Sequence, residues 1–207
     1  MSDFMRSSAL IFGLFNPFLL TIYLIDMVQR FEFKAFSGIL FRATLISIII
    51  FSIFALIGDA IFSDVIQAEF ASFQIFGGIV FLLIGLKFMF KGPSSIEILR
   101  GDPEQLVGVI VMPFFVGPGT ISASVLIGKR LEPLSACLAI ALGLGASVAI
   151  MIVMKRIHDY VRSNREPLVQ RYIEISGRIT ALYVGTIAIE MIMHGFTTWL
   201  SKLISLQ

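Results

Sequence analysis

Two proline-containing breaks, each near the middle of a long apolar run, constrain this chain more than any other feature. Asn16-Pro17 interrupts the run over residues 7–25, and Gly117-Pro118-Gly119 interrupts the run over residues 106–128. Proline lacks an amide donor and clashes with the preceding turn, so we expect a helix to open at each place. Each break lies about halfway across a hydrocarbon core of roughly 30 Å. Open backbone at that depth is tolerated only where protein buries it or where it lines a cavity.

The composition is that of a membrane protein. Of the 207 residues, 57% are hydrophobic and 14% are charged, and the mean hydropathy is +0.93. Soluble domains carry about 25% charged residues, so this chain lacks the charge to cover a surface that faces water. Six segments have about the length needed to cross a bilayer, namely residues 7–25, 43–58, 70–86, 106–128, 133–154 and 172–200. We therefore expect a single all-α polytopic membrane domain over residues 1–207.

The positive charges are distributed unevenly between the connections. Most Lys and Arg residues follow the first, third and fifth spans: Arg30, Lys34, Arg42, Lys87, Lys91, Arg100, Lys155, Arg156, Arg162, Arg165 and Arg171. The opposite side has only Arg6, Lys129, Arg130 and Lys202. The positive-inside rule then predicts that the richer side is cytoplasmic and that both termini lie outside. The acidic connection with Asp59, Asp64 and Glu69 faces outward in this arrangement. The rule accounts for the net charge of +2 without nucleic acid as a partner.

The third and sixth spans share a sequence pattern at an interval of 100 residues. Ile75, Gly77, Ile79, Leu82 and Gly85 match Ile175, Gly177, Ile179, Leu182 and Gly185. The two proline breaks lie at nearly the same interval, whereas the second and fifth spans show no such match. A repeated unit of three spans must take opposite orientations in its two copies, so we expect two inverted three-helix repeats, over about 1–92 and 104–207. The alternative is a plain six-helix bundle in which the glycines serve close packing.

The two breaks offer complementary chemistry at the predicted midplane. Gly117, Pro118, Gly119 and Thr120 predict a loop followed by a new helix start, where free amides attract an anionic group. Ser122 and Ser124 follow in the same run. In the first break, Pro17 frees a carbonyl upstream, while Asn16 and Thr21 offer an amide and a hydroxyl suited to an ammonium group. These residues predict a site for a small zwitterion. The alternative is a pair of packing kinks whose hydroxyls bond back to their own helix.

Few other polar groups lie in the spans. Glu190, four residues before His194 in the sixth span, is a candidate ion-coupling carboxylate; in a long or tilted span it reaches the interface instead. His158 is expected in the polar connection after the fifth span, exposed to solvent. The chain has no Walker-type phosphate loop, HExxH or GxSxG motif, and two His and one Cys are a poor set for a metal site. We expect no enzymatic activity, no cofactor and no bound metal.

Three groups of residues resemble the MarC family. They are Asn16-Pro17-Phe18, Gly77-Gly78 with Gly85 and Met89-Phe90, and Met112-Pro113 with Gly117-Pro118-Gly119-Thr120-Ile121. The resemblance covers essentially the whole chain, and its most specific part is the GPGTI segment. Members of the MarC family are six-span inner-membrane proteins, also grouped with small neutral amino acid transporters in the LysE exporter superfamily. The resemblance thus implies multi-pass insertion in a prokaryotic inner membrane and transport of glycine, alanine or serine, coupled to a proton or sodium gradient.

Two other functions remain open from the sequence. An ion or metal exporter of the same superfamily would need several carboxylates or histidines converging in the spans, and only Glu190 and His194 offer themselves. A non-transporting membrane assembly protein would tolerate loss of the proline breaks and would retain a stoichiometric partner. The sequence leaves the oligomeric state open, with a homo-oligomer as one option.

Overall fold

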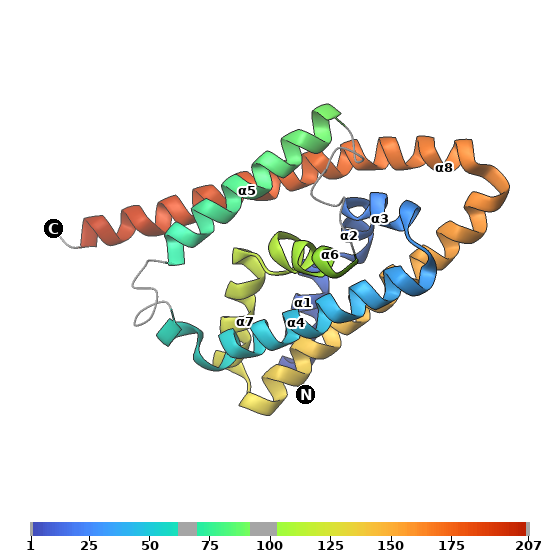
Figure 1. Ribbon diagram of the computed structural model, residues 1–207. Helices are drawn as coiled ribbons and strands as arrows, with labels where there is room; N and C mark the ends of the chain where they lie inside the picture. Colours follow the sequence, from blue (N-terminus) through green and yellow to red (C-terminus); the bar gives the residue numbers. More distant parts are fainter. Residues whose placement is uncertain (1, 62–69, 92–102, 206–207) are drawn as a thin grey trace.

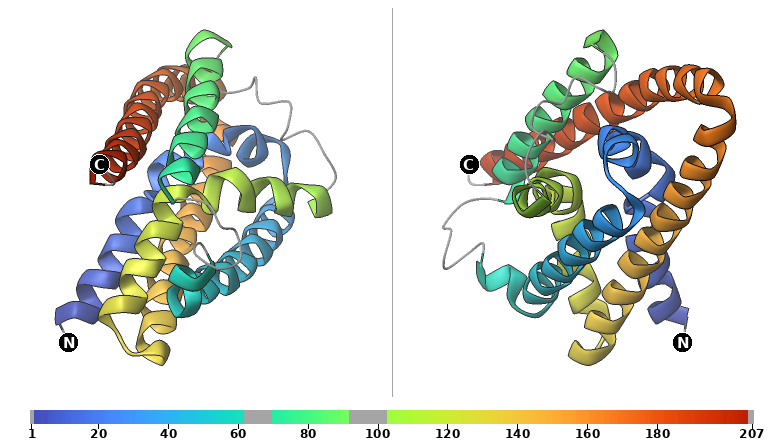
Figure 2. Two further views of the ribbon diagram at one scale, coloured as in Figure 1. Left: turned by 90° about the vertical axis from the view of Figure 1, so that its left-hand side faces the viewer. Right: turned by 45° about the vertical axis from the view of Figure 1, so that its right-hand side comes forward.

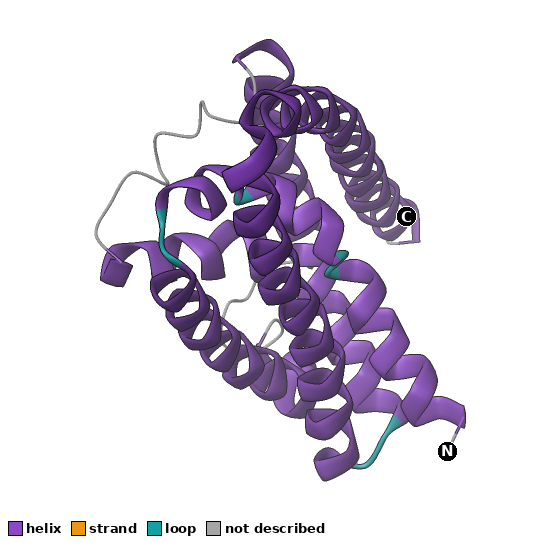
Figure 3. Ribbon diagram, turned by 90° about the vertical axis from the view of Figure 1, so that its right-hand side faces the viewer, coloured by secondary structure: helices purple, strands orange, loops and turns teal. Residues whose placement is uncertain are grey.

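The computed structural model describes residues 2–61, 70–91 and 103–205, and every element in these ranges is helical (Figures 1 and 3). The elements are α1 (Ser2–Leu14), α2 (Pro17–Tyr23), α3 (Ile25–Arg30), α4 (Phe33–Ala60), α5 (Phe70–Lys91), α6 (Pro103–Val109), the π-helical segment η4 (Ile110–Phe115), α7 (Pro118–Arg130) and α8 (Pro133–Ser205). Asp64 and Glu69 of the predicted outer connection, and Arg100 of the predicted inner one, lie outside the described residues.

Four stretches in these ranges are long and apolar enough to cross a membrane: Asp3–Tyr23, Phe33–Gly58, Phe70–Lys87 and Pro133–Val161. They correspond to the first, second, third and fifth predicted spans. The fourth predicted span is divided among α6, η4 and α7. The sixth predicted span falls in the second part of α8, and its first side chains, such as that of Glu174, are not among those that the structure describes. The all-helical membrane architecture is therefore established, while six crossings remain an expectation.

Both proline breaks are present. α1 ends at Leu14 and α2 begins at Pro17, while η4 ends at Phe115 and α7 begins at Pro118. Each proline is the first residue of its helix, where its missing amide costs nothing and its fixed φ suits the helix. Between η4 and α7, Val116 and Gly117 are extended, with Gly117 at φ −130° and ψ 172°. A further irregularity was not anticipated: Met112, which precedes a proline, adopts φ −122° and ψ 125° because the proline ring disfavours the helical region there.

The prediction of a polar connection between the fifth and sixth spans is wrong in its structure. α8 is one continuous helix of 73 residues from Pro133 to Ser205. Its middle part turns back on itself, so that the helix forms two arms (Figure 1, orange). The segment over 156–171 contains Arg156, Arg162, Arg165 and Arg171, and Arg is a good helix former; the helix continues there although the segment also contains Pro167. Polarity there indicated emergence from the membrane, but it does not end a helix.

The two arms of α8 organise the packing of the other helices. The first arm lies among α1, α2 and α4, and α7 packs on α4 at the far side (Figure 2). α5 follows the second arm along its length and runs in the opposite direction (Figure 1). Between the two arms of α8 lie the short helices α2 and α3 and the break before α7 (Figure 1).

Burial repeats between α4 and the first arm of α8 at an interval of 100 residues. Five buried residues of α4 each have a buried counterpart 100 residues later in α8. The pairs are Phe36 and Ala136, Leu40 and Ile140, Ala43 and Gly143, Ser47 and Ser147, and Phe51 and Met151. The links into the two helices match as well. Phe31 and Leu131 each end the preceding helix in an extended conformation, and Glu32 and Glu132 each accept the first hydrogen bond of the next. An Arg-x-Glu signal at 30–32 and 130–132 could have revealed this match in the sequence.

Glycines let α5 approach the second arm of α8 closely. A Cβ atom on Gly85 would lie 3.3 Å from the amide nitrogen of Gly185, its partner in the sequence pattern. A Cβ on Gly78 would lie 2.8 Å from the carbonyl oxygen of Ala188, and one on Gly195 would lie 2.6 Å from that of Ala71. Small residues at such positions allow helices to pack backbone to backbone in a membrane.

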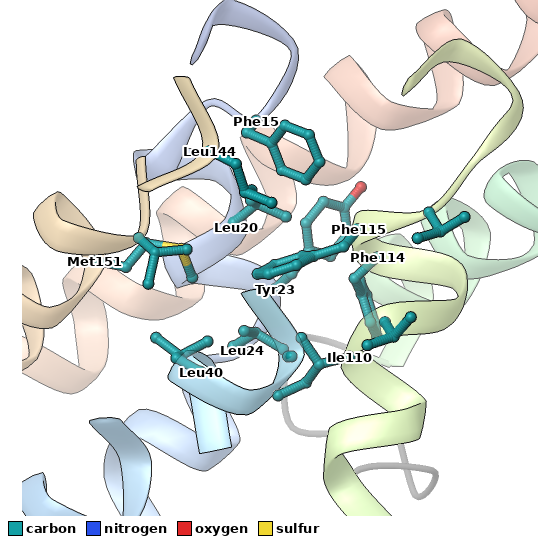
Figure 4. Close-up of a cluster of buried hydrophobic side chains, with 14 of the residues drawn as sticks. Phe15, Leu20, Tyr23, Leu24, Leu40, Ile110, Phe114, Phe115, Leu144 and Met151 are labelled. Atoms are coloured by element: carbon teal, nitrogen blue, oxygen red, sulfur yellow. The ribbon is translucent and has the colours of Figure 1, made fainter. Parts of the chain in front are cut away.

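An aromatic cluster joins the two breaks. Phe15, beside the first break, packs edge-to-face against Phe115 at the second, with ring centroids 5.4 Å apart. It also packs edge-to-face against Phe51 of α4 at 5.7 Å. Figure 4 shows Phe15, Phe114, Phe115 and Tyr23 gathered at this point. The breaks, about 100 residues apart in the chain, therefore meet in the core.

Candidate functional site

The first break is held by Asn16, which caps α2. Its Oδ1 atom accepts hydrogen bonds from the amides of Phe18 at 3.2 Å and Leu19 at 3.3 Å. Asn is among the preferred residues at this position because its side chain satisfies amides that lack a helical partner. Since these amides bond to Asn16, the carbonyls of Leu14 and Phe15 lose the partners that a continuous helix would give them. The side-chain oxygen of Asn16 thus serves the backbone, and the carbonyls of Leu14 and Phe15 do not accept from the amides four residues later.

The second break is held by the hydroxyl of Thr120. Its Oγ1 atom accepts a hydrogen bond from the amide of Gly117 at 2.9 Å and lies 2.9 Å from the carbonyl oxygens of both Phe115 and Gly117, to which it can donate. The first helical bond of α7 runs from the amide of Ile121 to the Gly117 carbonyl. The amides of Gly119 and Thr120 precede that bond, so they have no acceptor within the helix.

We expect Thr120→Val to destabilise the second break. Valine has nearly the same shape but leaves the Gly117 amide and a neighbouring carbonyl without their hydroxyl partner, which costs about 1–3 kcal/mol for buried groups. Thr120→Ser keeps the hydroxyl and is the matched control. The measurement is the thermal unfolding midpoint in detergent micelles. Equal midpoints for the valine and serine variants would show that the hydroxyl does not hold the break.

Two of the remaining predicted hydroxyls, those of Thr21 and Ser124, bond to their own helices. Thr21 Oγ1 donates to the Pro17 carbonyl at 2.7 Å and lies 3.6 Å from Sδ of Met154 on α8. Ser124 Oγ donates to the Thr120 carbonyl at 2.8 Å. Both side chains are buried, while Ser122 is half-buried on α7. These bonds to the carbonyl four residues earlier are the arrangement that the packing-kink alternative expects.

A cavity of about 120 Å³ lies between the two breaks. Its lining comes from four parts of the fold: Leu14, Leu19, Leu20 and Tyr23 around the first break; Phe114, Phe115, Gly117, Gly119 and Thr120 around the second; Phe81 of α5; and Val184, Ile187 and Met191 of α8. Of the predicted site residues, Gly117, Gly119 and Thr120 border this cavity. Asn16, Pro17, Thr21, Pro118, Ser122 and Ser124 do not appear in its lining.

The lining carries no formal charge and is largely apolar. It contains no Asp, Glu, Lys, Arg or His. The lining residues with polar side chains are Thr120 and Tyr23, and Leu14 and Gly117 bring the backbone of the two breaks to it. The aromatic lining residues Tyr23, Phe81, Phe114 and Phe115 are not among the predicted site residues, because nothing in an apolar run distinguishes a cavity wall from a lipid contact.

Glu190 lies apart from this cavity. It borders a groove of about 440 Å³ on the surface between α5 and the second arm of α8, which Gly85 and Gly185 also line. Its side chain and that of His194 are exposed. The proposed ion-coupling carboxylate therefore has no direct contact with the space between the breaks.

The comparison with known families agrees with the fold. The family described as MarC family integral membrane protein matches residues 1–200. The chain belongs to the MarC family. It is thus an integral membrane protein, and the GPGTI segment that indicated the resemblance is the part that forms the second break.

Curated relatives of this MarC protein come from archaea. A UPF0056 membrane protein of Methanocaldococcus jannaschii is 25% identical over 203 residues, which cover 93% of this chain and 95% of the relative. One from Archaeoglobus fulgidus is 23% identical over 190 residues, covering 88% and 85%. One from Pyrococcus horikoshii is 20% identical over 177 residues, covering 84% of each. No solved structure matches the chain significantly.

Proposed function

We propose that this MarC protein is a secondary transporter, without enzymatic activity, for small neutral amino acids such as glycine, alanine or serine. The observation that carries the proposal is the size and position of the cavity between the two breaks. An engineered cavity of about 150 Å³ holds one benzene molecule. A cavity of about 120 Å³ therefore has room for roughly five or six non-hydrogen atoms, the size of glycine or alanine.

The backbone at the two breaks suits the two ends of a zwitterion. The amides of Gly119 and Thr120 stand at the N-terminus of α7, a helix of 13 residues whose dipole favours a carboxylate. The carbonyls that end α1 stand at the other break, where they can accept from an ammonium group. An uncharged lining penalises a solute with a net charge, because burying an unpaired charge is costly.

We further propose that two inverted halves alternate access to this cavity. The matching burial of α4 and the first arm of α8, and the contact between Gly85 and Gly185, support a repeat at an interval of 100 residues. The antiparallel course of α5 and the second arm of α8 supports opposite orientations of the two copies (Figure 1). The loop charges support insertion in the cell membrane of a prokaryote with both termini outside.

Counterflow in proteoliposomes tests this function. Vesicles loaded with unlabelled alanine should transiently accumulate labelled alanine from outside, because a carrier exchanges the two across the membrane. We expect glycine, alanine and serine to compete, and lysine, glutamate and divalent metal ions not to compete. Folded, inserted protein that gives no exchange would contradict the proposal, and competition by a metal ion alone would favour the ion-exporter alternative.

A further inference from the structure

A cluster of three titratable side chains lies on α8, away from the cavity. The ammonium group of Lys155 donates to the carbonyl oxygen of Val28 at 2.7 Å and to Oδ1 of Asp159 at 2.5 Å. The Nδ1 atom of His158 lies 3.5 Å from the same Oδ1 atom. The side chain of Lys155 is only 3% exposed, that of His158 11%, and that of Asp159 38%. His158, expected in a solvated loop, is therefore in a helix and nearly buried, because α8 continues through this segment.

Lys155 connects α8 to α3, the second of the two short helices after the first break. Val28 belongs to the last turn of α3, where a cation satisfies carbonyls without helical partners. The contact lies close to the cavity along the chain, because Tyr23 of the cavity lining precedes Val28 by five residues across the junction of α2 and α3. Leu24 and Met151 belong to the same buried cluster as Leu20 and Tyr23 (Figure 4). Loosening Lys155 therefore frees α3, the helix that directly follows α2, and α2 supplies Leu19, Leu20 and Tyr23 to the cavity wall.

We infer that His158 is a proton-binding site that releases this contact and so couples transport to a proton gradient; the coupling rests on the proposed function. Lys155 and His158 reach for one carboxylate oxygen. A proton on the imidazole makes it a second cation there, which competes for Asp159 and repels Lys155. Lys155 then loses its hold on Val28, α3 separates from α8, and the cavity opens toward the predicted cytoplasmic side. Histidine suits this task because it exchanges protons near neutral pH.

Protons have a route to this cluster from the surface. Asp159 borders an open surface cavity of about 470 Å³, together with Phe33, Arg156, Ile157 and Tyr160. The guanidinium of Arg156 is held over the ring of Phe33, 5.1 Å from its centroid, and does not pair with Asp159 in any described contact. Other titratable groups on the neighbouring helices are the buried Tyr23, the half-buried Asp26 and the exposed Arg30, Glu32, Lys34 and Arg42.

The transport test compares the two histidines of the chain. In proteoliposomes, an inward proton gradient should drive accumulation of labelled alanine by the unmodified protein. We expect His158→Gln to lose both gradient-driven accumulation and counterflow by at least tenfold, because the cavity cannot open to the predicted cytoplasmic side without the proton. His194→Gln, at the exposed histidine, should behave like the unmodified protein. Normal accumulation by His158→Gln, or accumulation driven by sodium and not by protons, would overturn the inference.

A second measurement reports the contact without any transport. Val28→Cys, in a protein whose single Cys137 is replaced by Ala, places a thiol in the fully buried position beneath Lys155. Its labelling by a water-soluble maleimide should rise at least fivefold between pH 7.5 and 5.5. His158→Gln should abolish this rise, and Asp159→Asn should give fast labelling at both pH values. Unchanged labelling in the presence of His158 would overturn the inference even if exchange is normal. A rise without any exchange would refute the proposed transport alone.

Discussion

Gly119→Leu should abolish amino acid exchange while leaving the protein inserted and folded. Gly119 borders the cavity between the breaks, and a Cβ atom built on it meets nothing within 4 Å. The new side chain therefore enters open space without displacing backbone. Four added carbon atoms occupy most of a volume of about 120 Å³, which has room for roughly five or six non-hydrogen atoms. We expect at least a tenfold loss of counterflow.

The control for this variant is Gly13→Leu. Gly13 lies on the exposed side of α1, and its Cβ position is also open. The Gly13→Leu variant should therefore exchange alanine at the rate of the unmodified protein. Gly119→Ala adds a single carbon and is expected to impair serine and alanine more than glycine, because less of the cavity remains. If Gly119→Leu exchanges alanine as well as Gly13→Leu does, the cavity between the breaks is not the substrate site.

Gly77→Ala should destabilise the fold strongly for the addition of one methyl group. A Cβ atom on Gly77 would lie 2.0 Å from Cγ of Pro118 and 2.5 Å from its Cδ. The proline ring is rigid and buried at the start of α7, so either α5 or the second break must move. Overpacking of this kind costs about 1–3 kcal/mol, and sometimes more.

The thermal unfolding midpoint in detergent measures this cost, and Gly185→Ala is the matched control. Gly185 lies in the same α5–α8 contact region, yet its own Cβ position is open. We expect a midpoint several degrees lower for Gly77→Ala and little change for Gly185→Ala. A Gly77→Ala protein as stable as its control would mean that α5 does not pack against the second break.

The sequence predicts the helical membrane class and the positions of both breaks because these depend on local chemistry. Pro17 follows Asn16 and Pro118 lies between two glycines, so each proline coincides with a local signal for a new helix start, and Leu14 and Phe115 end the helices before them. Gly117, Gly119 and Thr120 follow from the same reasoning, since a helix start always leaves amides free. The continuity of α8 was missed because a polar run resembles a loop when only hydropathy is considered.

The tertiary relations could not be read from the chain. Thr21 and Ser124 have the composition of ligands, but which way a hydroxyl points depends on neighbours elsewhere in the sequence. Lys155 stands in a run of cations typical of a cytoplasmic end, and only the position of the Val28 carbonyl shows that it is buried. Glu190 has the sequence position of an intramembrane carboxylate, whereas the structure places it at the surface groove between α5 and the second arm of α8.

The unbroken course of α8 joins the Lys155 contact to the cavity wall within one helix. One end of its first arm carries Lys155, and its second arm supplies Val184, Ile187 and Met191 to the cavity wall. The helix turns back on itself between these arms, and its second arm contacts α5 backbone to backbone at Gly78 and Gly85. The Lys155 contact and three residues of the cavity wall therefore belong to one continuous helix that also borders α5. Events at the membrane surface can thus change the shape of the cavity without any residue connecting the two directly.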